Sequence, residues 1–128
     1  MAVAASALRA QQSRMRIIAE NIANAESTAQ TAGGTPYRRQ IPVFEASNID
    51  GATGVTLAAV KPDQGDFRMD YDPSHPAANA DGYVMRPNVD TLVEAMDMRE
   101  AQRAYEANLN VIETARSMES RTLDILKR

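Results

Sequence analysis

Three side chains in the middle of the chain have the types and the spacing of a metal site. Asp70, Asp72 and His75 place two carboxylates and the chain's one imidazole within six residues, and such groups can bind a divalent cation together. A small metal-dependent enzyme is therefore one hypothesis. The favoured alternative is a rigid turn, because Pro73 and Pro76 have a fixed φ and bias the preceding residues toward an extended conformation.

Other catalytic arrangements have little support in the sequence. The chain has no cysteine and one histidine, it lacks a Gly-x-Ser-x-Gly motif, and Gly33-Gly34 is not followed by the lysine of a phosphate-binding loop. The neighbouring carboxylates of Asp63 and Asp66 are typical of an acidic, solvated loop. The sequence therefore predicts a protein that is not an enzyme and that uses no cofactor and no metal.

Charge and hydropathy argue against two classes of partner. The 14 basic and 17 acidic side chains leave a formal net charge of -3, without the basic surplus that binds a phosphate backbone. No stretch approaches the roughly 20 apolar residues of a membrane span, and none has the pattern of a cleaved signal peptide. We predict no nucleic-acid binding and no direct membrane insertion, and we interpret Arg38 and Arg39 as ion-pair partners of a neighbouring subunit.

The apolar residues of the chain are mostly small. Alanine contributes 22 residues, whereas Val, Ile, Leu and Phe together contribute 23 of 128, less than the roughly one-fifth below which a chain struggles to bury a core alone. Low net charge and helical periodicity argue against disorder. We therefore expect a marginally stable monomer whose helices complete their packing against other subunits.

Glycine and proline divide the chain into three segments. All 6 glycines and 6 prolines lie between Gly33 and Pro87, so both terminal segments lack helix-breaking residues. The sequence predicts an α+β fold, in which long N- and C-terminal helices pair as a coiled-coil-like bundle, with a small β-rich insert between them in the chain. The segments of this single structural unit are residues 1–32, the N-terminal helix and its exit; residues 33–87, the insert; and residues 88–128, the C-terminal helix.

The N-terminal segment carries one apolar stripe with steps of three and four residues, as in a coiled-coil seam. About 22 residues of helix fit this pattern, and the helix should end near residues 24–28, where Asn, Ser and Thr compete for backbone hydrogen bonds. The stripe consists of Ala4, Leu8, Met15, Ile18, Ile22 and Ala25.

The C-terminal segment carries two stripes. We expect its helix to begin after Asn88 as N-cap, with Asp90 and Glu94 near the positive end of the helix dipole. One stripe suffices to pair with the N-terminal helix, so the second indicates packing against another copy. The first stripe contains Ala101, Ala104, Asn108, Val111, Ala115, Met118, Thr122 and Ile125, and the second contains Tyr105, Leu109, Ile112, Leu123 and Leu126.

Within the insert, we expect short strands at residues 42–44, 55–60, 67–71 and 82–85, separated by Gly, Pro, Asp and Asn. The turn near the last two strands should act as a rigid joint of an assembly. Its residues are Asp72, Pro73, His75, Pro76, Gly82 and Tyr83.

Three asparagines near the stripes have two interpretations. Asn21 and Asn24 lie beside the N-terminal stripe, and Asn108 lies within a C-terminal one. They mark frayed or solvent-exposed helix positions, or they are buried amides that specify register and partner at some cost in stability.

Both ends of the chain resemble the flagellar rod and hook proteins, the axial proteins of the bacterial flagellum. The N-terminal match runs from Ala10 to Thr28 and includes Ile18-Ala-Glu-Asn-Ile-Ala-Asn, and the C-terminal match includes Pro87-Asn-Val-Asp and Ala101-Gln-Arg-Ala-Tyr-Glu-Ala-Asn. The middle, with Tyr71-Asp-Pro-Ser-His-Pro, resembles a proximal rod member. Two departures stand out, because Met1 lies only a few residues before the stripe, where the family has a longer leader, and Ala7 stands where glycine is common.

The resemblance implies a structural subunit of the basal-body rod, which crosses the periplasm and transmits torque from motor to hook. Its partners would be other rod subunits, copies of itself and, during secretion without a cleaved signal peptide, the flagellar type III export apparatus. Another rod subunit of the same family and a soluble adaptor remain alternatives. The expected assembly residues are Leu8, Met15, Ile18, Asn21, Ile22, Asn24, Tyr105, Asn108, Leu109, Val111, Ile112, Met118 and Ile125.

Overall fold

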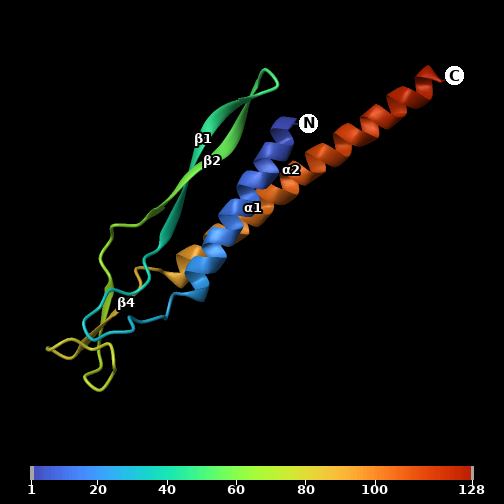
Figure 1. The fold of residues 1–128 in the computed structure, drawn as a ribbon. Coiled ribbons are helices and arrows are strands. Elements are labelled where there is room, and N and C mark those ends of the chain that lie inside the picture. Colours follow the sequence, from blue (N-terminus) through green and yellow to red (C-terminus); the bar gives the residue numbers. More distant parts are fainter. Residues whose placement is uncertain (1, 128) are drawn as a thin grey trace.

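The computed structural model describes residues 2–127 and confirms the predicted α+β fold. Its elements are α1 (Ala2–Ala23), β1 (Gln40–Ile49), β2 (Ala52–Pro62), β3 (Arg68–Tyr71), β4 (Tyr83–Arg86) and α2 (Thr91–Leu126). The two helices run antiparallel, and α1 lies between α2 and the β1–β2 hairpin (Figure 1). The molecule is therefore an elongated stack of hairpin, short helix and long helix.

Helix α1 ends where the sequence predicts. After Ala23 the chain leaves the helix in a turn, and the Asn24 side chain donates to the carbonyl of Glu20 at 2.8 Å. The same carbonyl also accepts from the backbone N–H of Asn24 at 3.1 Å, so this residue donates twice to the last turn of the helix. The asparagine thus helps to close the C-terminal end of α1.

The predicted N-cap of α2 was wrong by two residues. Asp90, not Asn88, caps the helix, and its carboxylate accepts from the backbone N–H groups of Leu92 at 3.0 Å and Val93 at 3.4 Å. Both residue types cap helices well, but the Asn88 amide is occupied elsewhere, where it bonds to the backbone of Arg39 and of the loop after β2. Tertiary contacts therefore decide which of the two residues is the cap.

The two helices differ in length. Helix α1 has 22 residues and α2 has 36, or roughly 33 Å and 54 Å at 1.5 Å per residue. The C-terminal end of α2 consequently extends beyond the N-terminal end of α1 (Figure 1). No helix within residues 2–127 has the length and hydropathy to cross a lipid bilayer.

The β1–β2 hairpin is longer than the predicted strands at 42–44 and 55–60. Its antiparallel register runs from Gln40 opposite Pro62 to Ile49 opposite Ala52. Asp50 and Gly51 form the two-residue turn with φ of 51° and 81°, the positive values that a type I′ hairpin turn requires. The Asp-Gly pair between two strand-like runs was the signal that should have extended the prediction.

The second hairpin lies within one residue of its predicted position. Strands β3 and β4 pair with Arg68 opposite Arg86 and Tyr71 opposite Tyr83, and the two tyrosine rings meet edge to face with centroids 5.3 Å apart. Gly82, at a φ of 86°, precedes β4. The predicted turn therefore connects two paired strands.

The core is small and contains many short side chains, as the composition predicts. Ser6, Ala10, Ile17 and Asn21 form a buried stripe on α1, of which the sequence analysis selected only Asn21. Ser6 and Ala10 lie against β2. The buried apolar residues among 2–127 include Ala10, Ile17, Ile18, Ala25, Pro36, Ala77, Val84, Pro87, Val89, Ala101 and Ile112.

Gly54 lies at a close contact of β2 with Ile49 of β1 and Ser6 of α1. A Cβ atom at this position would lie 2.2 Å from Cδ1 of Ile49 and 2.9 Å from Oγ of Ser6. The neighbouring N–H of Val55 donates to the same Ser6 hydroxyl at 3.3 Å. The absence of a side chain at Gly54 thus permits the hairpin to dock on α1.

We expect Gly54→Val to lower the free energy of unfolding by about 1–3 kcal/mol, the usual cost of overpacking. Urea denaturation followed by circular dichroism measures it. Ala58→Val, at an exposed position of the same strand, is the matched control and should change stability by less than about 0.5 kcal/mol. Equal effects of the two substitutions would contradict the close docking.

Candidate assembly interface

A buried amide connects α1 to the start of the hairpin. Asn21 is 1% exposed, and its Oδ1 accepts from the N–H of Gln40 at 2.9 Å and from the hydroxyl of Tyr37 at 2.6 Å. Its Nδ2 donates to the carbonyl of Gln40 at 2.9 Å. The Asn21 side chain therefore pairs with the backbone of Gln40 as another strand would, which fixes the helix relative to the start of β1.

Tyr37 is held in its protonated form at this contact. Burial, together with the negative charges of Glu20 and Glu94, raises the pKa of the Tyr37 hydroxyl above its ordinary value of 10.0. Each cause disfavours a second negative charge. Around neutral pH the hydroxyl therefore always has a proton to donate to Asn21.

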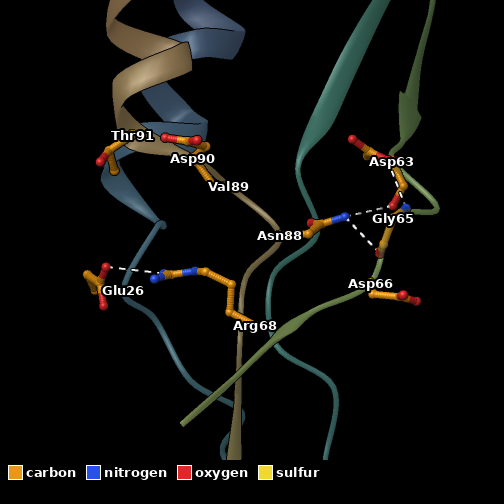
Figure 2. Close-up of a pocket in the computed structure, with 9 residues that line it drawn as sticks. All are labelled: Glu26, Asp63, Gly65, Asp66, Arg68, Asn88, Val89, Asp90 and Thr91. Atoms are coloured by element: carbon orange, nitrogen blue, oxygen red, sulfur yellow. Dashed lines mark hydrogen bonds and ion pairs between the residues drawn. The ribbon is translucent and has the colours of Figure 1, made fainter.

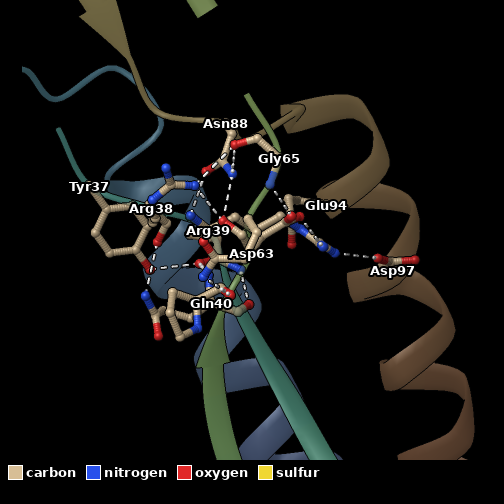
Figure 3. A network of polar contacts seen from close by, with 12 residues as sticks. Tyr37, Arg38, Arg39, Gln40, Asp63, Gly65, Asn88, Glu94 and Asp97 are labelled. Carbon is tan, nitrogen blue, oxygen red and sulfur yellow. Dashed lines mark hydrogen bonds and ion pairs between the residues drawn. The ribbon is translucent and has the colours of Figure 1, made fainter. Parts of the chain in front are cut away.

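Arg39 connects the hairpin to α2. Its Nε donates to Oε1 of Glu94, a carboxylate that is only 1% exposed. Its Nη1 lies 3.3 Å from Asp63 and its Nη2 lies 3.8 Å from Asp97 (Figure 3). Burial lowers the pKa of Arg39, but hydrogen bonds and charge from Glu94 and Asp63 outweigh it and leave that pKa raised.

The loop between β2 and β3 is hydrogen-bonded to the residues around Arg39. Asn88 accepts from the N–H of Arg39 at 2.8 Å and donates to the carbonyls of Asp63 and Gly65, each at 3.1 Å. Arg38 donates to the same two carbonyls and lies 4.2 Å above the Phe67 ring. We call Asn21, Tyr37, Arg39, Asn88 and Glu94 the polar joint.

The polar joint corrects one prediction. Arg38 and Arg39 were expected to form ion pairs with a neighbouring subunit, whereas within the chain Arg39 forms ion pairs with carboxylates and Arg38 donates to backbone carbonyls. The error arose because the sequence separates Arg39 from Glu94 by 55 positions, and only the fold brings them together.

The metal-site hypothesis for the insert is also wrong. Asp70 pairs with Arg86 at 3.1 Å, Asp72 accepts from Ser74 at 3.0 Å, and Nδ1 of His75 accepts from the N–H of Ala77 at 3.0 Å. Within residues 2–127 no three acidic or histidine side chains are placed to hold a metal ion. These side chains instead stabilise the turn.

An acidic groove of about 400 Å³ lies beside the start of α2 (Figure 2). Glu26, Asp63, Asp66 and Asp90 contribute carboxylates to its lining. Arg68 enters it and donates to Glu26 at 3.2 Å and to the carbonyl of Ala25 at 3.1 Å. This arginine thereby joins the exit of α1 to β3.

The residues expected at the seam of α1 differ in exposure. Ile18 and Asn21 are buried, while Leu8, Met15 and Asn24 are half-buried. Ile22 is exposed. Contacts within the chain thus cover part of this stripe and leave the rest accessible.

Some of the predicted assembly residues on α2 are covered by the rest of the subunit, and others are exposed. Ile112 is buried, Tyr105 and Asn108 are half-buried, and Leu109 is just exposed. Asn108 donates to the carbonyl of Ala104 at 2.9 Å, within its own helix. The uncovered positions are Val111, 58% exposed, Met118, 62% exposed, and Ile125, 71% exposed.

We call residues 113–127 the overhang. Every residue in it is exposed except Ala115, which is half-buried. At the other end of α2, Leu92, Val93 and Met96 are exposed apolar side chains that the sequence analysis did not select. Their apolar character in the first two turns of the helix was the available signal.

Two family models match the ends of the chain. The model described as "Flagella basal body rod protein" matches residues 1–29, and the model described as "Flagellar basal body rod FlgEFG protein C-terminal" matches residues 80–125. These segments contain α1 and nearly all of α2. Fold and matches together define the class as flagellar basal-body rod proteins.

Curated relatives cover almost the whole chain. The flagellar basal-body rod protein FlgC of Agrobacterium fabrum is 48% identical over 128 residues, which are 98% of this chain and 91% of the relative. FlgC of Salmonella typhimurium is 39% identical (96% and 92% covered), and FlgC of Bacillus subtilis is 37% identical (98% and 95% covered). The chain belongs to the FlgC family of flagellar basal-body rod proteins.

The family confirms the predicted function. The chain is a structural, non-enzymatic subunit of the basal-body rod, and it assembles with other rod subunits. Its functional site is therefore an assembly surface.

We expect Asn21→Ala to lower the free energy of unfolding by about 1–3 kcal/mol, because it leaves the backbone of Gln40 and the Tyr37 hydroxyl without their partner. Asn24→Ala is the matched control, since that amide bonds only to its own helix. Thermal unfolding of both variants measures the difference. A loss that is equal at the two positions would show that the Asn21 contacts contribute nothing specific.

Proposed function

We propose that this chain forms part of the wall of the proximal rod, and that its overhang packs on neighbouring subunits. The observation that carries the proposal is the overhang itself, with exposed Met118, Leu123, Ile125 and Leu126. Its partners are other rod subunits and copies of this chain. The resulting tube transmits torque from the motor to the hook.

The overhang has few stabilising contacts within its own subunit, because nearly all of its side chains are exposed. The overhang continues a longer helix and needs no nucleus of its own, but helices in proteins are stabilised mainly by packing of their apolar face. Its large apolar side chains gain free energy when a neighbour covers them. Coupled folding and binding of the overhang would therefore drive assembly.

The predicted assembly residues divide into two roles under this proposal. Ile22, Leu109, Val111, Met118 and Ile125 are exposed and contact neighbours. The other eight are buried or half-buried and stabilise the subunit itself, which holds the exposed ones in place; they are Leu8, Met15, Ile18, Asn21, Asn24, Tyr105, Asn108 and Ile112.

We also propose distinct roles for the three segments. Residues 1–32 and 88–128 form the axial helices, and residues 33–87 form the outer insert; Met1 and Arg128 lie outside the described residues. The insert turn, with Asp72, Pro73, His75, Pro76, Gly82 and Tyr83, specifies the position of the subunit along the rod. Tyr71 and Met69 beside it are exposed and available for contact.

The polar joint is suited to a subunit that transmits torque. It ties α1, the hairpin and α2 through hydrogen bonds of Asn21, Arg39 and Asn88. Torque applied to the outer insert can pass to the axial helices through this joint.

The small core supports export as a flexible chain through the flagellar type III apparatus, without a cleaved signal, into a rod that crosses the periplasm.

We expect Val111→Asp to abolish incorporation into rods, because burying an unpaired carboxylate at a subunit contact is costly. Asn110→Asp introduces the same charge at a neighbouring exposed position and should still assemble. Each variant is expressed in cells that lack the native subunit. Immunoblots of purified basal bodies and swimming on soft agar give the result.

Thermal unfolding of the purified variants separates assembly from folding. Val111 is exposed in the monomer, so its replacement should leave the midpoint close to that of the unsubstituted chain. Rods that contain the Val111→Asp chain at the normal level would count against the proposed contact.

A further inference from the structure

The side of α2 that packs on α1 continues into the overhang. Among the helices and strands of residues 2–127, only α1 packs on α2. Ile112 is 8% exposed, whereas every later residue up to 127 except Ala115 is exposed, so the cover from α1 ends at Ile112. The same side of the helix continues past this point in steps of three and four residues, as in a coiled-coil seam. We call this side the terminal seam; its positions are Leu109, Ile112, Arg116, Glu119, Leu123 and Leu126.

The terminal seam is apolar at both ends and charged in its middle. Leucine or isoleucine occupies the two positions before the charged pair and the two positions after it. Arg116 and Glu119 are exposed and form no ion pair with the described residues. Leu123 and Leu126 are 58% and 76% exposed. Both the charges and the leucines are therefore accessible to a second molecule.

The order of the two charges decides how two such seams pair. In a parallel pair in register, Arg116 would face Arg116 and Glu119 would face Glu119, and facing like charges are unfavourable. In an antiparallel pair centred between residues 117 and 118, Arg116 of each copy faces Glu119 of the other. The charge pattern is thus complementary to itself in the antiparallel orientation.

The apolar positions agree with this alignment. Leu123 of one copy comes opposite Ile112 of the other, at the point where α1 ends. Leu126 comes opposite Leu109, which is 36% exposed and so still accessible. A second copy would therefore take over from α1 along the overhang and remove leucine surface from water.

We propose that two copies of this chain pair antiparallel through their terminal seams and form a closed dimer outside the rod. Both copies use the same surface, so the contact is isologous and leaves no free site for further growth. The dimer covers part of the overhang that packs on neighbours in the rod, and it therefore competes with assembly. This competing role rests on the proposed function, whereas the dimer itself does not.

Sedimentation equilibrium of the purified full chain tests the proposal. We expect a reversible equilibrium between monomer and dimer, with no larger species. Arg116→Glu and Glu119→Arg each place like charges opposite one another at two points, and each should raise the dimer dissociation constant by about tenfold. A chain with both substitutions again pairs opposite charges and should recover the original constant.

The matched control is Arg121→Glu, which reverses an exposed charge on the opposite side of the same helix. It should leave the dissociation constant unchanged. Circular dichroism should show the same helix content in all variants, because every substituted side chain is exposed.

A spin label reports the orientation of the two copies. The chain has no cysteine of its own, so Lys127→Cys provides a single attachment point. The antiparallel alignment places residue 127 opposite residue 108, which separates the two labels by roughly 30 Å at 1.5 Å per residue. A parallel pair would bring them within about one helix diameter, roughly 10–12 Å. Pulsed electron paramagnetic resonance measures this distance.

Four results would overturn the inference: a chain that stays monomeric at high concentration, growth beyond a dimer, a double variant as weak as the single ones, or labels within one helix diameter. An equal loss of dimer in Arg121→Glu would contradict the assignment to the terminal seam. Failure of the proposed function would appear instead as absence of the chain from purified rods, so the two failures are distinguishable.

Discussion

The ion pair between Arg39 and Glu94 is the contact on which the arrangement of the subunit depends. Glu94 is almost fully buried, and removing one partner of a buried ion pair costs about 3–5 kcal/mol because the other charge stays uncompensated. Arg39 precedes β1 directly and Glu94 lies in the first turn of α2, so this one bond fixes the hairpin relative to the long helix. Asn21 fixes the same hairpin relative to α1.

With its start fixed in this way, α2 extends past α1 and its last turns find no partner within the described chain. Small residues such as Ser6, Ala10 and Ala101 let the layers approach closely, but they bury little apolar area for each residue. The large apolar side chains are instead concentrated on exposed parts of α2. The subunit is thus built with a modest core and an assembly surface that depends on neighbours.

Much of this fold follows from the sequence. The position of every glycine and proline predicted the helix–insert–helix order, and Asn24, Ser27 and Thr28 after Ala23 predicted where α1 ends. Periodicity could not predict which polar residues become buried, because Asn21, Glu94 and Arg39 acquire their environments only when distant segments meet. For the same reason Asp90, and not Asn88, caps α2. The spacing of Asp70, Asp72 and His75 alone suggested a metal site, but in the fold each of the three side chains bonds to another residue of the insert.

The central claim is that neighbouring subunits cover the overhang in the rod. Hydrogen exchange followed by mass spectrometry, on the dilute monomer and on purified rods, tests it most directly. The overhang amides should exchange rapidly in the monomer and become strongly protected in rods, while the middle of α1 is protected in both. Rapid exchange of residues 113–127 within intact rods, or strong protection already in the dilute monomer, would contradict the account.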